Sequence, residues 1–194
     1  MYFQSIGDLC DSNNDEASLG GTGSSNVAAV DMTRGSGLLP GTFPDTFGSS
    51  DWGSSDDPEE YIEFGVTVDP GFKVQLNELL IGTNSSDIGP GIIGVFTSLD
   101  SFTTPVAELS QSGSGFKYFM VDLLSLLDDT TRDFTIRLKE VGNTQTVGSS
   151  DTSDDGLFLL FRYDDGSGAT TPIQITGSLV EDVSCRCCCC CCCC

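Results

Sequence analysis

The strongest signal in the chain is an alternation of apolar and polar positions between Tyr61 and Gly82. Apolar side chains occupy every second position of YIEFGVTV (61–68), and the same alternation returns in FKVQLN (72–77). A period of two indicates strands with one buried face. The tripeptide Asp69-Pro70-Gly71 between them is typical of a tight turn, because Pro fixes φ and Gly permits positive φ. The sequence therefore predicts a β-hairpin over this stretch.

Several further segments have the alternation or the apolar content of short strands. They are 27–33, 92–99, 106–110, 116–122, 132–140, 157–163 and 173–179. Only 123–129 resembles a helical turn. About nine or ten strands with almost no helix predict an all-β fold, an antiparallel β-sandwich of jelly-roll type. The inward positions of the alternating segments give a predicted core of Ile62, Phe64, Val66, Phe72, Val74, Phe134, Ile136 and Leu138.

The length of 194 residues predicts one domain of sandwich size. Residues 1–5 are set aside, because Tyr2-Phe3-Gln4-Ser5 resembles the remainder of a protease-cleavable tag. The domain is then expected to span 6–183. Within it, 34–57 is loop-like but carries five large apolar side chains, which predict that it covers one end or face of the sandwich. These side chains are Leu38, Leu39, Phe43, Phe47 and Trp52.

Cysteine usage is unusual at the end of the chain. Cys10 and Cys185 are the only cysteines outside the terminal run Cys187 to Cys194, and that run fits no metal-ligand spacing and no disulfide framework. We interpret residues 184–194 as an artefact or a disordered tail, with a metal-binding or surface-tethering tail as the alternative. Cys10 and Cys185 could form a disulfide if the first and last strands are neighbours, which would imply oxidising surroundings.

The formal net charge of -21 limits the partners of the domain. Nucleic-acid binding needs clustered Lys and Arg, whereas the 8 basic residues here are scattered, so we expect no nucleic acid as a partner. Contact of this domain with an anionic membrane surface is disfavoured for the same reason. The acidity itself has two interpretations: solubility in a salty or extracellular medium, or calcium binding by some of the carboxylates.

If calcium is bound, we expect its site around the segment 157–163, because aspartates both precede and follow it. Calcium needs six to eight oxygen ligands, which Asp-rich surface loops can supply. The spacing is not that of an EF-hand loop, so solvated turn residues stay the alternative. The candidate ligands are Asp151, Asp154, Asp155, Asp164 and Asp165.

Catalysis has little support in the sequence. The chain has no histidine, the commonest general base and the commonest zinc ligand. It also has no nucleophile elbow and no phosphate-binding glycine loop after a strand. A glycosidase would need two carboxyl groups across a cleft, for which Glu59, Glu60 and Glu63 are the only noteworthy group. We therefore predict that the protein is not an enzyme.

Aromatic side chains offer a second kind of site. A flat apolar ring suits the C–H groups of a pyranose, and a polar tip adds a hydrogen bond. Tyr61, Tyr118 and Tyr163 are candidates for such stacking. Trp52 is the strongest candidate because it lies in a Gly- and Ser-rich loop, with packing in the core as the alternative.

A series of short motifs follows a familiar order along the chain. It runs through Arg34-Gly35-Ser36-Gly37-Leu38, Ser50-Asp51-Trp52, Tyr61-Ile62-Glu63-Phe64, Pro70-Gly71-Phe72, Gly89-Pro90 and Ser98-Leu99-Asp100-Ser101-Phe102, and continues at Val121 to Leu123 and Phe134 to Leu138. The order resembles the exported bacterial β-sandwich domains that precede PEP-CTERM-type sorting signals, over residues 17–180. The resemblance implies export, a cell-surface or matrix location, no catalysis and a distant relationship to carbohydrate-binding jelly rolls. It supplies no binding residues.

These observations lead to one expected function and one alternative. We expect a non-catalytic secreted or cell-surface domain that binds a glycan such as a polysaccharide. The alternative is a structural or adhesive protein that contacts other surface proteins as a subunit of an extracellular assembly. A row of exposed aromatic side chains in a groove would favour the first, and an exposed strand edge or a self-complementary apolar patch would favour the second.

Overall fold

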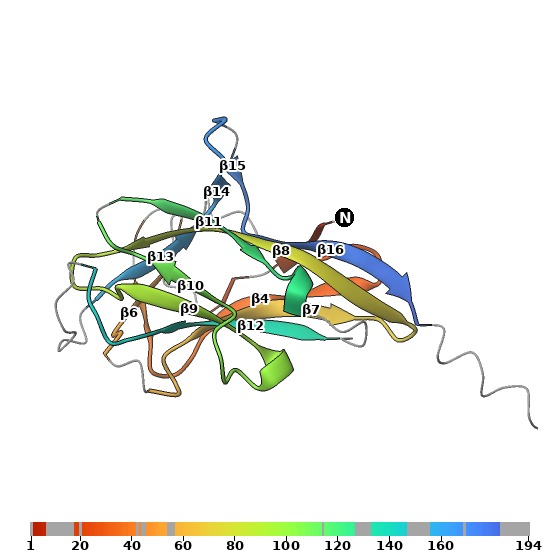
Figure 1. Cartoon of the computed structure of the whole chain (residues 1–194), viewed down its shortest axis with the longest axis horizontal. Helices are drawn as coiled ribbons and strands as arrows, with labels where there is room; N and C mark the ends of the chain where they lie inside the picture. Colours follow the sequence, from red (N-terminus) through yellow and green to blue (C-terminus); the bar gives the residue numbers. More distant parts are fainter. Residues whose placement is uncertain are drawn as a thin grey trace, which may run out of the picture.

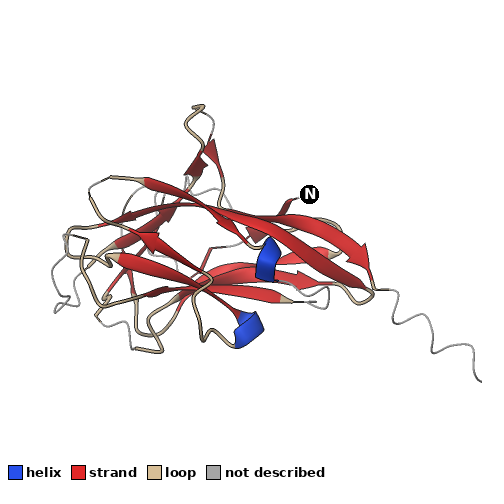
Figure 2. Ribbon diagram, viewed as in Figure 1, coloured by secondary structure: helices blue, strands red, loops and turns tan. Residues whose placement is uncertain are grey.

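The computed structural model describes residues 2–6, 18–19, 21–41, 43, 46–53, 57–113, 115–126, 133–146, 156–168 and 170–182. This part of the chain is built almost entirely of strands (Figure 2). It contains no α-helix, and its two short 3-10 turns are η1 (Ser98–Asp100) and η2 (Leu124–Leu126).

Two antiparallel sheets face each other and form the two layers of the molecule (Figure 1). Sheet A has the order β3 (Gly21–Thr22), β1 (Tyr2–Ile6), β16 (Gln174–Glu181), β8 (Phe72–Ser85), β13 (Phe158–Phe161), β6 (Phe47–Ser50) and β5 (Leu39–Gly41), with β11 (Lys117–Asp122) also paired to β8. Sheet B has the order β10 (Ala107–Ser110), β9 (Ile92–Thr97), β12 (Phe134–Glu140), β7 (Ile62–Val68), β4 (Val27–Arg34) and β2 (Ser18–Leu19). A separate ribbon pairs β14 (Tyr163–Asp164) with β15 (Thr170–Thr171). The predicted all-β antiparallel sandwich is thereby confirmed.

The core lies between the sheets and consists of the inward positions of the long strands. Side chains at every second position of β7 and β12 are buried, as the alternation predicts. Seven of the eight predicted core residues are buried, and Phe72 is the exception. Phe72 is half-buried because it is the first residue of β8, beside the turn at the end of the sandwich, where it packs against the rim of the core.

The predicted hairpin over 61–82 is wrong, although both of its strands exist. β7 pairs with β4 and β12 in sheet B, whereas β8 pairs with β11, β13 and β16 in sheet A. The Asp69-Pro70-Gly71 turn therefore crosses from one layer to the other. Alternation requires only that each strand buries one face. Here β7 and β8 turn their buried faces toward each other across the core and do not pair edge to edge.

β8 has three neighbours, which shows how sheet A is built. β11 pairs with Glu78 to Thr83 on one side of β8, so β16 and β13 must share its other side. Phe161 of β13 pairs with Gly82, and Gln174 of β16 pairs with Leu80, which is only two residues before Gly82 in β8. β13 and β16 are thus two halves of one strand, and the ribbon of β14 and β15 projects between them (Figure 1).

The segment 34–57 contains the short strands β5 and β6 instead of a plain loop. Leu38, Phe47 and Trp52 are buried, whereas Leu39 and Phe43 are exposed, so the segment adds three side chains to the core and its strands form one end of sheet A. Arg34, at the end of β4 in sheet B, reaches β6 in sheet A.

Arg34 connects the two layers through several contacts at once. Its Nε and Nη2 donate to the Gly48 carbonyl oxygen at 2.9 and 2.6 Å, and Nε also lies 3.0 Å from Ser49 Oγ. The guanidinium carbon lies 3.7 Å from the centre of the Phe47 ring. Burial lowers the pKa of Arg34 to about 10, because a partly desolvated cation is less favourable than a hydrated one.

The N-terminal residues take part in the fold. The backbone of Tyr2–Ile6 forms β1, which pairs with β16 and β3, so residues 2–5, set aside as a tag remnant, lie in sheet A. Cys10, Cys185 and the run Cys187 to Cys194 lie outside the described residues. The disulfide between Cys10 and Cys185 therefore stays a prediction.

Candidate ligand-binding site

Four aromatic side chains gather on the outer face of sheet A: Phe116, Tyr118, Phe161 and Tyr163, referred to below as the aromatic cluster. The ring centres of Phe116 and Phe161 are 4.4 Å apart, those of Tyr118 and Phe161 5.7 Å, and those of Tyr118 and Tyr163 6.1 Å. All three pairs are edge-to-face, an arrangement in which the positive edge of one ring meets the negative face of another. The four rings therefore form one contiguous group of contacts.

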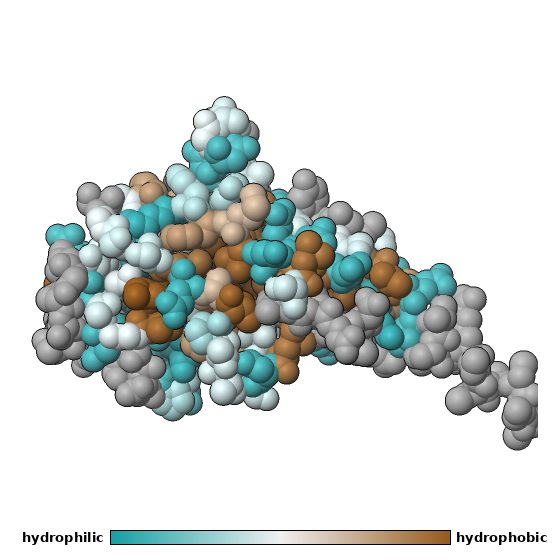
Figure 3. All heavy atoms as spheres, viewed as in Figure 1, coloured by the Kyte–Doolittle hydropathy of each residue, from teal (hydrophilic) through white to brown (hydrophobic). Residues whose placement is uncertain are grey.

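The alternation of β11 sets the exposure of this cluster. Val121 points to the core and is buried, whereas Tyr118 and Met120 point outward and are 42% and 63% exposed. Phe116, just before the strand, is 50% exposed, and the buried Phe161 forms the floor beneath the outer rings. Figure 3 shows apolar side chains gathered among polar ones on the side of the molecule that carries β11.

Tyr163 joins the cluster because the chain leaves sheet A immediately after β13. It is the first residue of β14 and lies at the base of the projecting ribbon, half-buried against Tyr118. The outward alternation of β11 and the departure of the chain from β13 thus bring together two of the tyrosines considered from sequence, although they are far apart along the chain.

The next two residues of the ribbon are the candidate calcium ligands Asp164 and Asp165. Asp164 Oδ1 accepts a hydrogen bond from Gly166 N and Asp165 Oδ1 one from Ser167 N, each at 2.8 Å. The hydrogen bonds from the side chain and the backbone of Ser167 lower the pKa of Asp165. Each carboxylate therefore stabilises the turn that follows it, as Asp commonly does.

The metal prediction is only partly covered by the described residues. Asp151, Asp154 and Asp155 lie outside them, so their convergence with Asp164 and Asp165 stays a prediction. Among the described side chains, no group of three or more His, Cys, Asp or Glu is placed to hold a metal ion.

Trp52 cannot serve as a stacking platform in this structure. Its side chain has no exposed surface, packs edge-to-face on Phe158 at 5.7 Å, and donates from Nε1 to the Ser49 carbonyl at 3.1 Å. The Gly- and Ser-rich surroundings suggested an exposed loop, but the strands β5 and β6 fold this segment against the core. Trp52 therefore packs in the core, which is the alternative stated in the sequence analysis.

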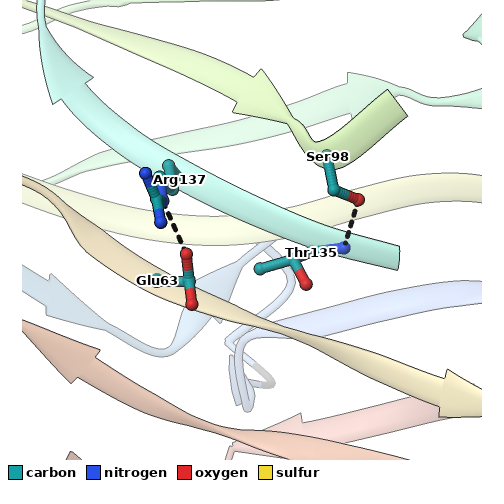
Figure 4. A network of polar contacts seen from close by, with 4 residues as sticks. All are labelled: Glu63, Ser98, Thr135 and Arg137. Atoms are coloured by element: carbon teal, nitrogen blue, oxygen red, sulfur yellow. Dashed lines mark hydrogen bonds and ion pairs between the residues drawn. The ribbon is translucent and has the colours of Figure 1, made fainter. Parts of the chain in front are cut away.

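Tyr61 lies on the other sheet, away from the aromatic cluster. The guanidinium carbon of Arg137 is 4.1 Å from the ring centres of both Tyr61 and Phe102, and Arg137 Nε lies 2.5 Å from Glu63 Oε2. Figure 4 shows Arg137 of β12 pointing to Glu63 on the neighbouring strand β7, with the Thr135 amide bonded to Ser98 nearby. One face of Tyr61 is thus occupied by a cation of the protein itself.

The carboxylates weighed as a glycosidase pair make structural contacts. Glu63 pairs with Arg137, Glu59 Oε2 accepts from Ser36 Oγ at 2.7 Å, and the buried Glu60 accepts from the Gly53 amide at 3.1 Å. Each has a partner that fixes its position.

Sequence reasoning missed the two phenylalanines and the methionine of this surface. Phe116 and Met120 resemble ordinary strand residues, because FKYFMVD (116–122) is apolar on both faces, and so does Phe161, because LFLLFRY (157–163) is too. That feature was the available signal: an edge strand with two apolar faces exposes one of them.

The sequence matches no model of a known protein family and none of the curated proteins with which it was compared. In the described part of the chain, no helix is both long and apolar enough to cross a membrane.

Proposed function

We propose that the protein is a non-catalytic secreted or cell-surface domain that binds a polysaccharide through the aromatic cluster. The observation that carries the proposal is the pair of tyrosines, Tyr118 and Tyr163, held edge-to-face beside the half-exposed Phe116. The resemblance to exported PEP-CTERM-associated domains supports the surface location.

The chemistry of the cluster suits a sugar better than most ligands. Exposed ring faces attract the C–H groups of a pyranose, and the phenol groups can donate to and accept from its hydroxyls. Asp164 and Asp165, which follow Tyr163 in the ribbon, offer acceptors for further hydroxyls. Because the protein carries a net charge of -21, a neutral glycan is favoured over an acidic one.

The first experiment is a glycan array, probed with the full chain in the presence and absence of calcium. For a glycan that the chain binds on the array, titration calorimetry then measures the affinities of the wild type, Tyr118→Ala and Tyr163→Ala. We expect each substitution to weaken binding about tenfold, a change of about 1.4 kcal/mol. Thermal unfolding of each variant establishes that it is folded.

Two further variants locate the site. Leu99→Ala removes a 40% exposed apolar side chain of η1, next to sheet B, and should leave the affinity unchanged. Tyr61→Ala tests the tyrosine on the other sheet independently. An equal loss with Leu99→Ala, or unchanged binding in both cluster variants, would reject the aromatic cluster as the site.

A further inference from the structure

β11 is the longest exposed strand edge among the described residues. The other strands with a single neighbour, which end the sheets or form the ribbon, contain two to four residues, whereas β11 has six. Proteins usually keep such edges short or place charges along them, because unpaired backbone groups recruit another strand. The four central residues of β11, Tyr118 to Val121, carry no charge.

The register of β11 on β8 determines which backbone groups face outward. The Leu123 amide donates to the Asn77 carbonyl at 2.8 Å, in the same register that pairs Lys117 with Thr83. In an antiparallel pair, residues alternate between bonding the neighbour and bonding the opposite side. The odd residues of β11 therefore bond to β8, and the N–H and C=O groups of Tyr118, Met120 and Asp122 point to the open edge. No described strand pairs with them there.

We propose that this edge pairs with β11 of a second copy of the chain, antiparallel about a two-fold axis at Phe119, so that sheet A continues across a dimer. The inference does not depend on glycan binding. It gives a concrete form to the alternative raised by the sequence, in which the domain is a subunit of an assembly.

Self-complementarity of the edge is the reason to assign a second copy as the occupant. With Phe119 on the axis, Tyr118 lies opposite the partner's Met120, and Met120 opposite the partner's Tyr118. Both pairs form at positions whose backbone groups face the open edge, so each can exchange two N–H···O bonds. A methionine sulfur against an aromatic ring is a favourable contact.

The same register avoids any direct clash of charges. Asp122 lies opposite the partner's Phe116, and the two Asp122 side chains are at opposite ends of the paired segment. All of these side chains are on the outer face, because residues of the same parity oppose each other. The exposed surfaces of Phe116, Tyr118 and Met120, at 50%, 42% and 63%, would be partly covered.

The net charge sets the conditions under which pairing is observed. Two copies that each carry a charge of -21 repel each other at low ionic strength, and salt screens this repulsion. The dimer should therefore become stronger between about 0.05 M and 0.5 M salt, where the Debye length shortens severalfold. An interface held by ion pairs would weaken over the same range.

Sedimentation equilibrium of the full chain, in reducing buffer to exclude cysteine cross-links, tests the proposal. We expect a monomer–dimer equilibrium for the wild type. Met120→Pro removes an amide that faces the open edge and leaves the bonds to β8 in place, a position at which Pro is tolerated in sheets. It should weaken the dimer about tenfold or more, because its bonds across the axis are lost.

If Met120→Pro does not fold, two charge variants at the same position test the pairing instead. In the proposed register the two Met120 side chains are diagonal neighbours across the axis, so Met120→Glu and Met120→Lys should each be monomeric through repulsion of like charges. A mixture of the two should recover a heterodimer. The control is Leu39→Glu, on the three-residue edge strand β5 of the same sheet, which should dimerise as the wild type does.

Two results would overturn the proposal. One is a wild-type chain that stays monomeric at about 0.5 M salt and millimolar concentration, where even weak edge pairing is populated. The other is a dimer whose dissociation constant is the same in all three Met120 variants as in the wild type, which would place the interface elsewhere.

Discussion

At the scale of the residue, the side chain of Arg34 joins the two layers through several contacts at once. Its guanidinium bonds the Gly48 carbonyl and the Ser49 hydroxyl and lies over the Phe47 ring. Each of these groups belongs to sheet A, while Arg34 belongs to sheet B. A lysine at this position would keep the charge but could not bond in two directions while stacking flat on a ring.

We expect Arg34→Lys to lower the free energy of unfolding by about 1–2 kcal/mol and Arg34→Ala by about 3 kcal/mol, because the buried Gly48 carbonyl then loses its charged donors. Urea unfolding measures both values. Lys139→Ala, at an outward position of β12, is the matched control and should change stability by less than about 0.5 kcal/mol. Equal effects of Arg34→Ala and Lys139→Ala would show that the contacts of Arg34 contribute nothing net.

At the scale of the element, the Asp69-Pro70-Gly71 turn decides how β7 and β8 are arranged. Gly71 has a φ of 91°, which L-residues with a β-carbon rarely adopt, and its carbonyl accepts from the Asp182 amide at 2.8 Å. Asp69 N in turn donates to the Asn26 carbonyl at 3.0 Å. The turn is thus held by segments of both sheets and carries the chain between them.

Gly71→Ala should lower the free energy of unfolding by about 1 kcal/mol, since a Cβ would have open space around it but an unfavourable φ. Gly71→Asn should cost less than Gly71→Ala although Asn is larger, because Asn tolerates positive φ better. Thermal unfolding distinguishes the two. If Asn is the more destabilising residue, space and not backbone conformation limits this position.

The same turn shows where sequence reasoning succeeds and where it stops. Alternation located β7 and β12 and their buried faces, because burial of one face is a local property of a strand. It could not tell which edges pair, because a hairpin and a crossing between layers have the same pattern. For the candidate site, chemistry selected Tyr118 and Tyr163, but their contact depends on the departure of the chain after β13. The burial of Trp52 depends on the pairing of β5 and β6, which a Gly- and Ser-rich segment does not signal.

At the scale of the whole molecule, a compact two-layer core supports a surface of high negative charge. Much of that charge is in loops and turns, where Asp164 and Asp165 already order their own backbone. The remaining oxygens of these aspartates are free to be tested as calcium ligands through the stability of the protein. An ion that binds only the native state raises the free energy of unfolding.

If Asp151, Asp154, Asp155, Asp164 and Asp165 bind calcium, the melting temperature should rise with calcium concentration and fall again with chelator. At 100 times the dissociation constant the gain is about 2.7 kcal/mol. Differential scanning calorimetry at constant ionic strength measures it, so that general screening is not mistaken for binding.

Asp164→Asn and Asp165→Asn should reduce this calcium response, and Asp31→Asn, exposed on β4 of the other sheet, should leave it intact. A melting temperature that does not depend on calcium in the wild type would leave the five aspartates as solvated turn residues.

The strand shared by β13 and β16 has a consequence for how this scaffold can vary. Because both halves run along the same side of β8 in the same direction, the ribbon between them is an insertion into a strand and not a connection between strands. Its length and composition can change without altering the path of either sheet, in the way that antibody frameworks carry loops of different length. Grafting a foreign peptide between Asp165 and Thr170 should therefore yield a folded display protein.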